Sequence, residues 1–234
     1  MIDAIGTAPQ PDAAGFVLAG GQSTRMGRDK ALLVFAGRPL IAHALFILAE
    51  AGLPASIAGG DPAARASLSA YAPVVKDAQP GLGPLGGICA ALASAATPHA
   101  VFLSIDLPFV PPSLVAYLLH HAQITGRAVT LCSVVGFAQT FPVVVDRAAL
   151  PALQAELAAG RNGCFSAFQT AAASLGQPPS VLPAELLAQT GNAADPSGFS
   201  PNLWFLNLNS PADLARGEAL HSRRAPHPSS AWVG

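Results

Sequence analysis

The strongest constraint on the fold of this chain is its alternation of short apolar runs with segments of helical periodicity. The apolar runs predict short buried strands at 15–18, 55–58, 73–76, 100–105, 128–135 and 141–145. The periodic segments predict helices at 39–51, 85–95, 111–121 and 146–159. Strands that alternate with helices predict βαβ units, and therefore an α/β fold with a mostly parallel sheet covered on both faces.

The last third of the chain departs from this rhythm. Residues 176–202 are rich in Pro, Gly, Gln and Asn and predict a loop-rich insertion. A late strand is predicted at 204–208, followed by a helix with Ser210 as its N-cap and Pro211 in its first turn. Residues 1–13 and 220–234 lack periodicity and are predicted to be flexible tails, which leaves one domain over 14–219.

Composition excludes several classes of protein. The chain has 234 residues, of which 51% are hydrophobic and 11% are charged, with a net charge of −1. It is too apolar for a disordered protein and has no general basic field for nucleic acid. Prolines interrupt its long uncharged stretches, so we expect no membrane span, and the first residues do not resemble a signal peptide. Three cysteines without metal-type spacing, Cys89, Cys132 and Cys164, predict thiols in a reducing, cytoplasmic setting.

The first apolar run leads into a string with the composition of a phosphate-binding loop. It reads Leu18-Ala19-Gly20-Gly21-Gln22-Ser23-Thr24-Arg25-Met26-Gly27-Arg28-Asp29-Lys30. Paired glycines let backbone N–H groups approach phosphate oxygens, and Arg25 and Lys30 supply cations for a polyphosphate. Neither the dinucleotide fingerprint nor the P-loop spacing is present. The alternative is a glycine turn flanked by solvated charges.

Asp106 follows the clearest buried strand of the sequence, 100–105. Ligands of open parallel sheets bind at the carboxyl ends of strands. A carboxylate there, beside a phosphate-binding loop on a neighbouring strand, suits Mg²⁺, which prefers one or two carboxylates together with phosphate oxygens and water. We therefore predict Asp106 as a metal ligand, with a helix cap as the alternative.

Residues 18–33 resemble the signature LAGGxSxRMGxDKALL of the molybdenum cofactor guanylyltransferases. The wider nucleotidyltransferase superfamily usually has a proline before the motif lysine, whereas this chain has Asp29. The resemblance implies a Rossmann-like three-layer α/β/α sandwich that transfers a nucleoside monophosphate from a triphosphate. It also implies nucleotide contacts at Leu18, Ala19, Gly20, Gly21 and Lys30.

Later segments extend the resemblance. Asp77 looks like the family's aspartate near the guanine nucleotide, and 81–87 resembles its GPLGG-type loop, which implies nucleotide contacts at Gly83, Pro84, Leu85 and Gly86. The segment 104–108 resembles the family's strand end with an xxDxP pattern, which includes Asp106. The resemblance implies an acceptor contact at Gln139, in a segment similar to the family's [QH]P-type segment but with its proline displaced. It implies further acceptor contacts at Asn207 and Asn209, in a segment similar to NxNTPEDL. The alternative is that the two asparagines are turn residues ahead of a helix. An asparagine that the family often has after the second strand is missing from 57–61.

The expected reaction is Mg²⁺-dependent transfer of GMP from GTP to a molybdopterin-type molybdenum cofactor, which releases pyrophosphate. Arg25, Lys30 and Asp106 are the expected catalytic residues, because an in-line transfer needs positioning and charge neutralisation more than a general base. One alternative is a cytidylyltransferase that uses CTP, and another is a non-catalytic nucleotide-binding protein that delivers the cofactor. Expected partners are the two substrates, with transient contact to molybdoenzymes or their chaperones, and neither nucleic acid nor membrane.

Overall fold

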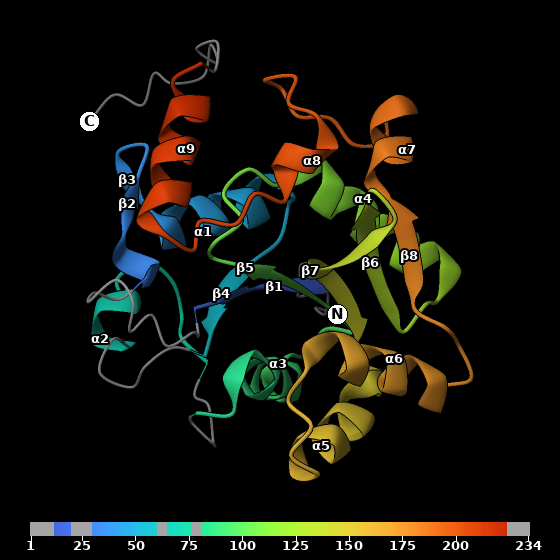
Figure 1. Cartoon of the computed structure of the whole chain (residues 1–234). Helices are drawn as coiled ribbons and strands as arrows, with labels where there is room; N and C mark the ends of the chain where they lie inside the picture. The colour runs from blue at the N-terminus through green and yellow to red at the C-terminus, as the bar shows by residue number, and fades with distance from the viewer. Residues whose placement is uncertain (1–11, 20–29, 60–64, 76–80, 224–234) are drawn as a thin grey trace, which may run out of the picture.

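The centre of the protein is a six-stranded sheet in the order β4-β1-β5-β7-β6-β8 (Figure 1). The computed structural model describes residues 12–19, 30–59, 65–75 and 81–223. The strands of the sheet are Ala13–Leu18 (β1), Ala55–Ala58 (β4), His99–Ser104 (β5), Val129–Val134 (β6), Phe137–Asp146 (β7) and Ser180–Pro183 (β8). Among them only β7 is antiparallel to its neighbours, so the predicted mostly parallel α/β sheet is confirmed.

Helices cover both faces of the sheet. They are Leu40–Glu50 (α1), Arg65–Leu68 (α2), Gly83–Ser94 (α3), Pro112–Thr125 (α4), Leu150–Ala158 (α5), Cys164–Ser174 (α6), Ala184–Gln189 (α7), Pro201–Trp204 (α8) and Pro211–His221 (α9). Single 3-10 turns lie at Lys30–Leu32 (η1) and Arg147–Ala149 (η2), and a small hairpin joins Val34–Phe35 (β2) to Arg38–Pro39 (β3). Within the described parts of the chain, no helix has the length and apolar character needed to cross a membrane.

The two faces of the sheet bury separate hydrophobic clusters. Val17 and Leu103 pack with α1 and α4 on one side. Phe16 and Phe102 pack with α3, α5 and α6 on the other, where their rings stack at a centroid distance of 5.5 Å. Residues on both faces of β1 and β5 are buried, which explains why the strands read as continuous apolar runs. The result is the three-layer sandwich that the family resemblance implied, with α3, α5 and α6 below the sheet in Figure 1.

The structure corrects the prediction for 176–202. This segment contains the edge strand β8 and helix α7, and α8 begins at its end, so it is not mainly loop. Strand β8 pairs in parallel with β6, and Ala184 and Leu187 of α7 are buried against the sheet. Tertiary packing therefore orders a segment whose composition suggested turns.

The strand predicted at 204–208 is also wrong. Trp204 ends α8, and the residues after it pair with no strand among the described ones. Trp204 and Leu208 are 1% exposed, so the apolar run records side-chain burial rather than strand pairing. The helix predicted from Ser210 is confirmed as α9, and the side chain of Ser210 caps it.

Three further predictions differ from the structure. The strand expected at 73–76 is reduced to a single bridge between Ile57 and Val74, and Lys76 lies outside the described residues. Helix α6 had no counterpart among the predicted elements. The first strand and the last helix reach slightly beyond the predicted bounds 14–219, because β1 begins at Ala13 and α9 ends at His221.

The pairing of β7 with β6 contains a register shift. Leu131 of β6 pairs with Val143, whereas the next residue, Cys132, pairs with Gln139. Residues 140–142 are therefore looped out of the ladder as a bulge. Bulges of this kind re-aim side chains next to functional sites.

Candidate active site

Asp106 lies two residues beyond the carboxyl end of β5, and its two carboxylate oxygens have different surroundings. Oδ2 accepts a hydrogen bond from Nζ of Lys30 at 3.0 Å, in an ion pair whose side chains are 17% and 16% exposed. Oδ1 is buried and accepts no hydrogen bond from any group in the described part of the chain. A buried carboxylate oxygen without a donor is costly. Oδ1 is therefore suited to ligate a cation.

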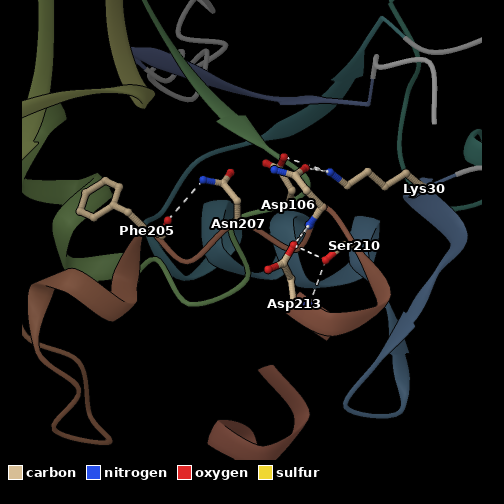
Figure 2. Close-up of polar contacts among 7 residues, drawn as sticks. Lys30, Asp106, Phe205, Asn207, Ser210 and Asp213 are labelled. Carbon is tan, nitrogen blue, oxygen red and sulfur yellow. Dashed lines mark hydrogen bonds and ion pairs between the residues drawn. The ribbon is translucent and has the colours of Figure 1, made fainter. Parts of the chain in front are cut away.

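Lys30 forms a second contact, with Asn209. Its Nζ also donates to Oδ1 of Asn209, so one ammonium group joins residues that are 76 and 179 positions away in the sequence (Figure 2). Lys30 is the first residue of η1, Asp106 follows β5, and Asn209 precedes α9. The fold thus brings together three of the predicted site residues. The sequence predicted that Asn209 contacts the acceptor, whereas the structure places its side chain on Lys30.

The start of α9 is tied to this cluster by hydrogen bonds of the chain before it. The backbone N–H of Leu208 donates to the carbonyl of Asp106 at 3.0 Å, and that of Asn209 donates to Oδ2 of Asp213 at 3.2 Å. Oγ of Ser210 donates to the same Asp213 oxygen at 2.7 Å and accepts from the backbone N–H of Asp213 at 3.2 Å. This bond from Ser210 lowers the pKa of Asp213 below its usual value. A charged Asp213 near the helix N-terminus is the favourable arrangement.

A cavity of about 420 Å³ opens beside Asp106. Its wall includes Pro84, Asp106, Gln139, Phe141, Cys164 and Asn207. The bulge in β7 explains why consecutive residues of that strand, from Ala138 to Phe141, reach the same cavity. Gln139 and Asn207, both predicted to contact the acceptor, are thus brought together with Asp106.

The sheet order places this cavity and the carboxyl end of β1 on opposite sides of Asp106. Strand β5 lies between β1 and β7, so the end of β1 lies on one side of Asp106 and the β7 wall of the cavity on the other.

The residues predicted to contact the nucleotide are only partly among those that the structure describes. Gly20, Gly21, Arg25 and Asp77 lie outside the described residues. Leu18 ends β1 and Ala19 follows it, both with buried side chains, so their backbone is the part left to contact a ligand.

The loop predicted from 81–87 opens α3. Gly83 begins the helix with a φ of +71°, which favours glycine, and Pro84 occupies its first turn. Leu85 and Gly86 are buried under the sheet, and a Cβ on Gly87 would lie 3.3 Å from the backbone nitrogen of Gly59. Close packing against the end of β4 thus fixes the start of α3, and it leaves Pro84 as the residue of this loop on the cavity wall.

Sequence reasoning missed Cys164 as a residue of the site. The sequence predicts only that Cys164 is a reduced thiol, but the residue begins α6 and lines the cavity. Burial raises the pKa of its thiol to about 11. Because α6 itself was not predicted, no signal in the sequence placed Cys164 near Asp106.

Comparison with solved structures defines the class. The structure titled "Molybdopterin-guanine dinucleotide biosynthesis protein A" from Archaeoglobus fulgidus superposes with a TM-score of 0.73 at 22% identity, over 90% of this chain and 99% of that one. The protein thus has the α/β nucleotidyltransferase fold, with its lysine–aspartate pair beyond the carboxyl end of the central strand β5. At this identity the similarity shows the fold alone.

The family follows from sequence comparison. A profile of the "MobA-like NTP transferase domain" matches residues 15–175, and the chain belongs to that family of nucleotidyltransferases. The "Molybdenum cofactor guanylyltransferase" of Rhodobacter capsulatus is 35% identical over 223 residues, which are 91% of this chain and 98% of that protein. The protein of the same name from Xanthomonas euvesicatoria is 38% identical over 110 residues, and there the match spans about half of each chain, 47% and 54%. The resemblance found in the sequence is therefore confirmed.

Proposed function

We propose that this enzyme transfers GMP from GTP to the phosphate of a molybdopterin-type molybdenum cofactor, which yields the guanine dinucleotide form and pyrophosphate. The observation that carries this proposal is the Lys30–Asp106 pair with a cavity on its β7 side. The name of the Rhodobacter relative, which matches along almost its whole length, supports the choice of nucleotide and acceptor.

We further propose that the reaction requires Mg²⁺, with Asp106 as the protein ligand. The buried Oδ1 of Asp106 fits this role, because Mg²⁺ needs few protein carboxylates when phosphates and water complete its shell. When bound, the ion would supply positive charge that neutralises the negative charge developing on the phosphates during transfer. No group of three or more potential metal ligands occurs among the described residues, so a site of the all-protein type is not seen in that part.

The residues of the chain act mainly by positioning and by electrostatics. The ammonium of Lys30 stabilises the triphosphate and then the departing pyrophosphate, and Arg25 acts with it from the first-strand loop. The acceptor occupies the cavity, where Gln139 and Asn207 offer amide groups to its polar edges. Because the attacking phosphate is already an anion, no general base is required.

The proposed setting of the reaction is the cytoplasm. Cys89, Cys132 and Cys164 form no disulfide, and thiols persist in a reducing compartment. The direct ligands are small molecules, and transient contact with molybdoenzymes or their chaperones would serve transfer of the product. Near-neutral charge gives no general field that would attract nucleic acid.

Replacement of Lys30 tests the proposal. Lys30→Ala is expected to reduce pyrophosphate release from GTP and the acceptor by about 100-fold or more, because one preorganised charge is lost. The partly exposed ion pair adds little stability, so the melting temperature is expected to fall by about 4 °C at most. A folded Lys30→Ala variant with normal turnover would exclude the proposed site.

A nucleotide comparison tests the choice of base. Turnover with GTP and with CTP is measured on the same acceptor preparation at saturating Mg²⁺. Preference for GTP is expected, and preference for CTP would reassign the enzyme as a cytidylyltransferase. Binding of nucleotide without release of pyrophosphate would favour the non-catalytic delivery protein instead.

A further inference from the structure

We propose that Asn209 is a positioning residue: its side-chain amide holds the ammonium of Lys30 on the Oδ2 side of Asp106, so that Oδ1 stays available to a cation. The inference rests on the proposed function of the same site, because it assigns Lys30 and Asp106 to nucleotidyl transfer. It gives Asn209 a partner on the protein in place of the acceptor contact expected from the sequence.

The first argument is the geometry around Lys30. A lysine side chain has a flexible four-carbon stem, and its ammonium has three donors that fit many arrangements. With Asp106 as its single partner, the ammonium could bridge both carboxylate oxygens. A second acceptor on Asn209 draws it to one side, and the structure shows Nζ on Oδ2 with Oδ1 left without a donor from the described residues.

The second argument is that the backbone of Asn209 is itself fixed. The residue before it is bonded to the carbonyl of Asp106, and its own N–H is bonded to Asp213. Leu208 is 1% exposed, and its side chain packs closely against Gly217 of α9, where an added Cβ would lie only 3.0 Å from it. The amide of Asn209 therefore lies on a short segment that is held between Asp106 and α9.

The third argument is charge. An amide oxygen accepts a hydrogen bond from the ammonium without a formal charge of its own. Lys30 therefore faces one carboxylate rather than two, and more of its positive charge remains for the phosphates. A carboxylate at position 209 would hold Lys30 in place but compete with the triphosphate for its charge.

Two substitutions separate these effects. Asn209→Ala removes the second acceptor, so we expect kcat to fall about tenfold while the KM for GTP changes less than threefold. Asn209→Asp keeps an acceptor, so we expect the KM for GTP to rise about tenfold. The matched amide control is Asn192→Ala, at an exposed asparagine after α7, which should retain wild-type kinetics.

A direct readout on Lys30 is possible because the chain has two lysines, Lys30 and Lys76. Protein labelled with ¹⁵N at lysine Nζ gives two side-chain signals, which Lys76→Arg assigns. The Lys30 signal is expected to shift and broaden in Asn209→Ala and to stay sharp in Asn209→Asp. An unchanged Lys30 signal in Asn209→Ala would overturn the inference.

A merely structural role is tested with Ser210→Ala, which removes the cap of α9 but leaves the amide of Asn209 in place. The loss in kcat is divided by the drop in melting temperature for each variant. The same ratio in Ser210→Ala and Asn209→Ala would overturn the inference. A loss of kcat that is found in Asn209→Ala alone supports it. If the wild-type chain shows no nucleotidyl transfer, the proposed function fails, while the Lys30 signal still decides whether Asn209 positions Lys30.

Discussion

At the scale of single residues, the thiol of Cys164 combines two properties. It lies on the wall of the cavity, yet burial raises its pKa to about 11. The thiolate is the reactive form of cysteine, so this thiol is accessible to a cavity ligand but poorly nucleophilic at neutral pH. Cys132, in the centre of β6, is 0% exposed, and burial raises the pKa of its thiol to about 12.

The rate of alkylation of Cys164 is therefore expected to rise steeply with pH. Below a pKa of about 11 the thiolate fraction grows about tenfold per pH unit, so the rate with iodoacetamide should rise about tenfold for each pH unit between pH 7 and pH 10. Mass spectrometry of the Cys164 peptide gives the rate, and Cys132 serves as the unreactive internal control. A rate that levels off near pH 8 would contradict the buried environment of this thiol.

Single residues also show what the sequence could predict of the site. Lys30 and Asp106 were predicted because each belongs to a short motif at a strand end. The fold brings Nζ of Lys30 to within 3.0 Å of Oδ2 of Asp106. The pairing of Lys30 with Asn209 was not predictable, because it depends on how α9 packs 179 positions later. Cys164 was missed for the same reason, since only the packing of α6 places it on the cavity.

At the scale of elements, the hairpin between β6 and β7 contains a strained position. Its two-residue turn is Val135-Gly136, with φ values of +50° and +78°. Both central residues of such a turn need positive φ, which suits Asn-Gly and disfavours a β-branched residue. Val135 is 66% exposed, so burial of its side chain does not explain its presence there.

Val135→Asn is expected to stabilise the protein by about 1 kcal/mol, because asparagine tolerates the left-handed conformation. Urea denaturation measures the change. Gly136→Ala is the matched control and should destabilise, since it places a Cβ at a φ of +78°. Equal or lower stability of Val135→Asn would contradict strain at this turn.

Elements with strong local signals were predicted well. The buried strands β1 and β5 and the capped helix α9 follow from apolar runs and from Ser210-Pro211. The edge strand β8 was missed because its residues are half-exposed, and an edge strand depends on a neighbour for its pairing. The strand predicted at 204–208 was wrong because burial of Trp204 in the core gives the same apolar pattern as a strand.

At the scale of the whole molecule, the site joins the two halves of the sheet. Asp106 follows β5, the carboxyl end of β1 lies on one side of it, and β7 forms the cavity wall on the other. The α9 region closes the cluster through Leu208 and Asn209. A ligand that engages these parts binds the folded state and not the unfolded chain, so it stabilises the entire domain.

A thermal-shift experiment tests this linkage. With GTP at about 100 times its Kd, binding contributes about 2.7 kcal/mol, so the melting temperature should rise by roughly 5 °C or more. The shift is expected to be larger with Mg²⁺ than without it, and Asp106→Asn should remove that difference while preserving the shape of the side chain. A shift that is independent of Mg²⁺ in the wild-type chain would contradict Asp106 as the metal ligand.

The bulge in β7 has a consequence for how related enzymes can diverge. Residues 140–142 leave the ladder between two paired positions, Gln139 and Val143, and part of this stretch lines the cavity. Chain length can therefore change at this point while both flanking pairs keep their register. Insertion or deletion of residues here can change the shape of the cavity without disturbing Lys30 and Asp106, so the cavity and the lysine–aspartate pair can evolve separately.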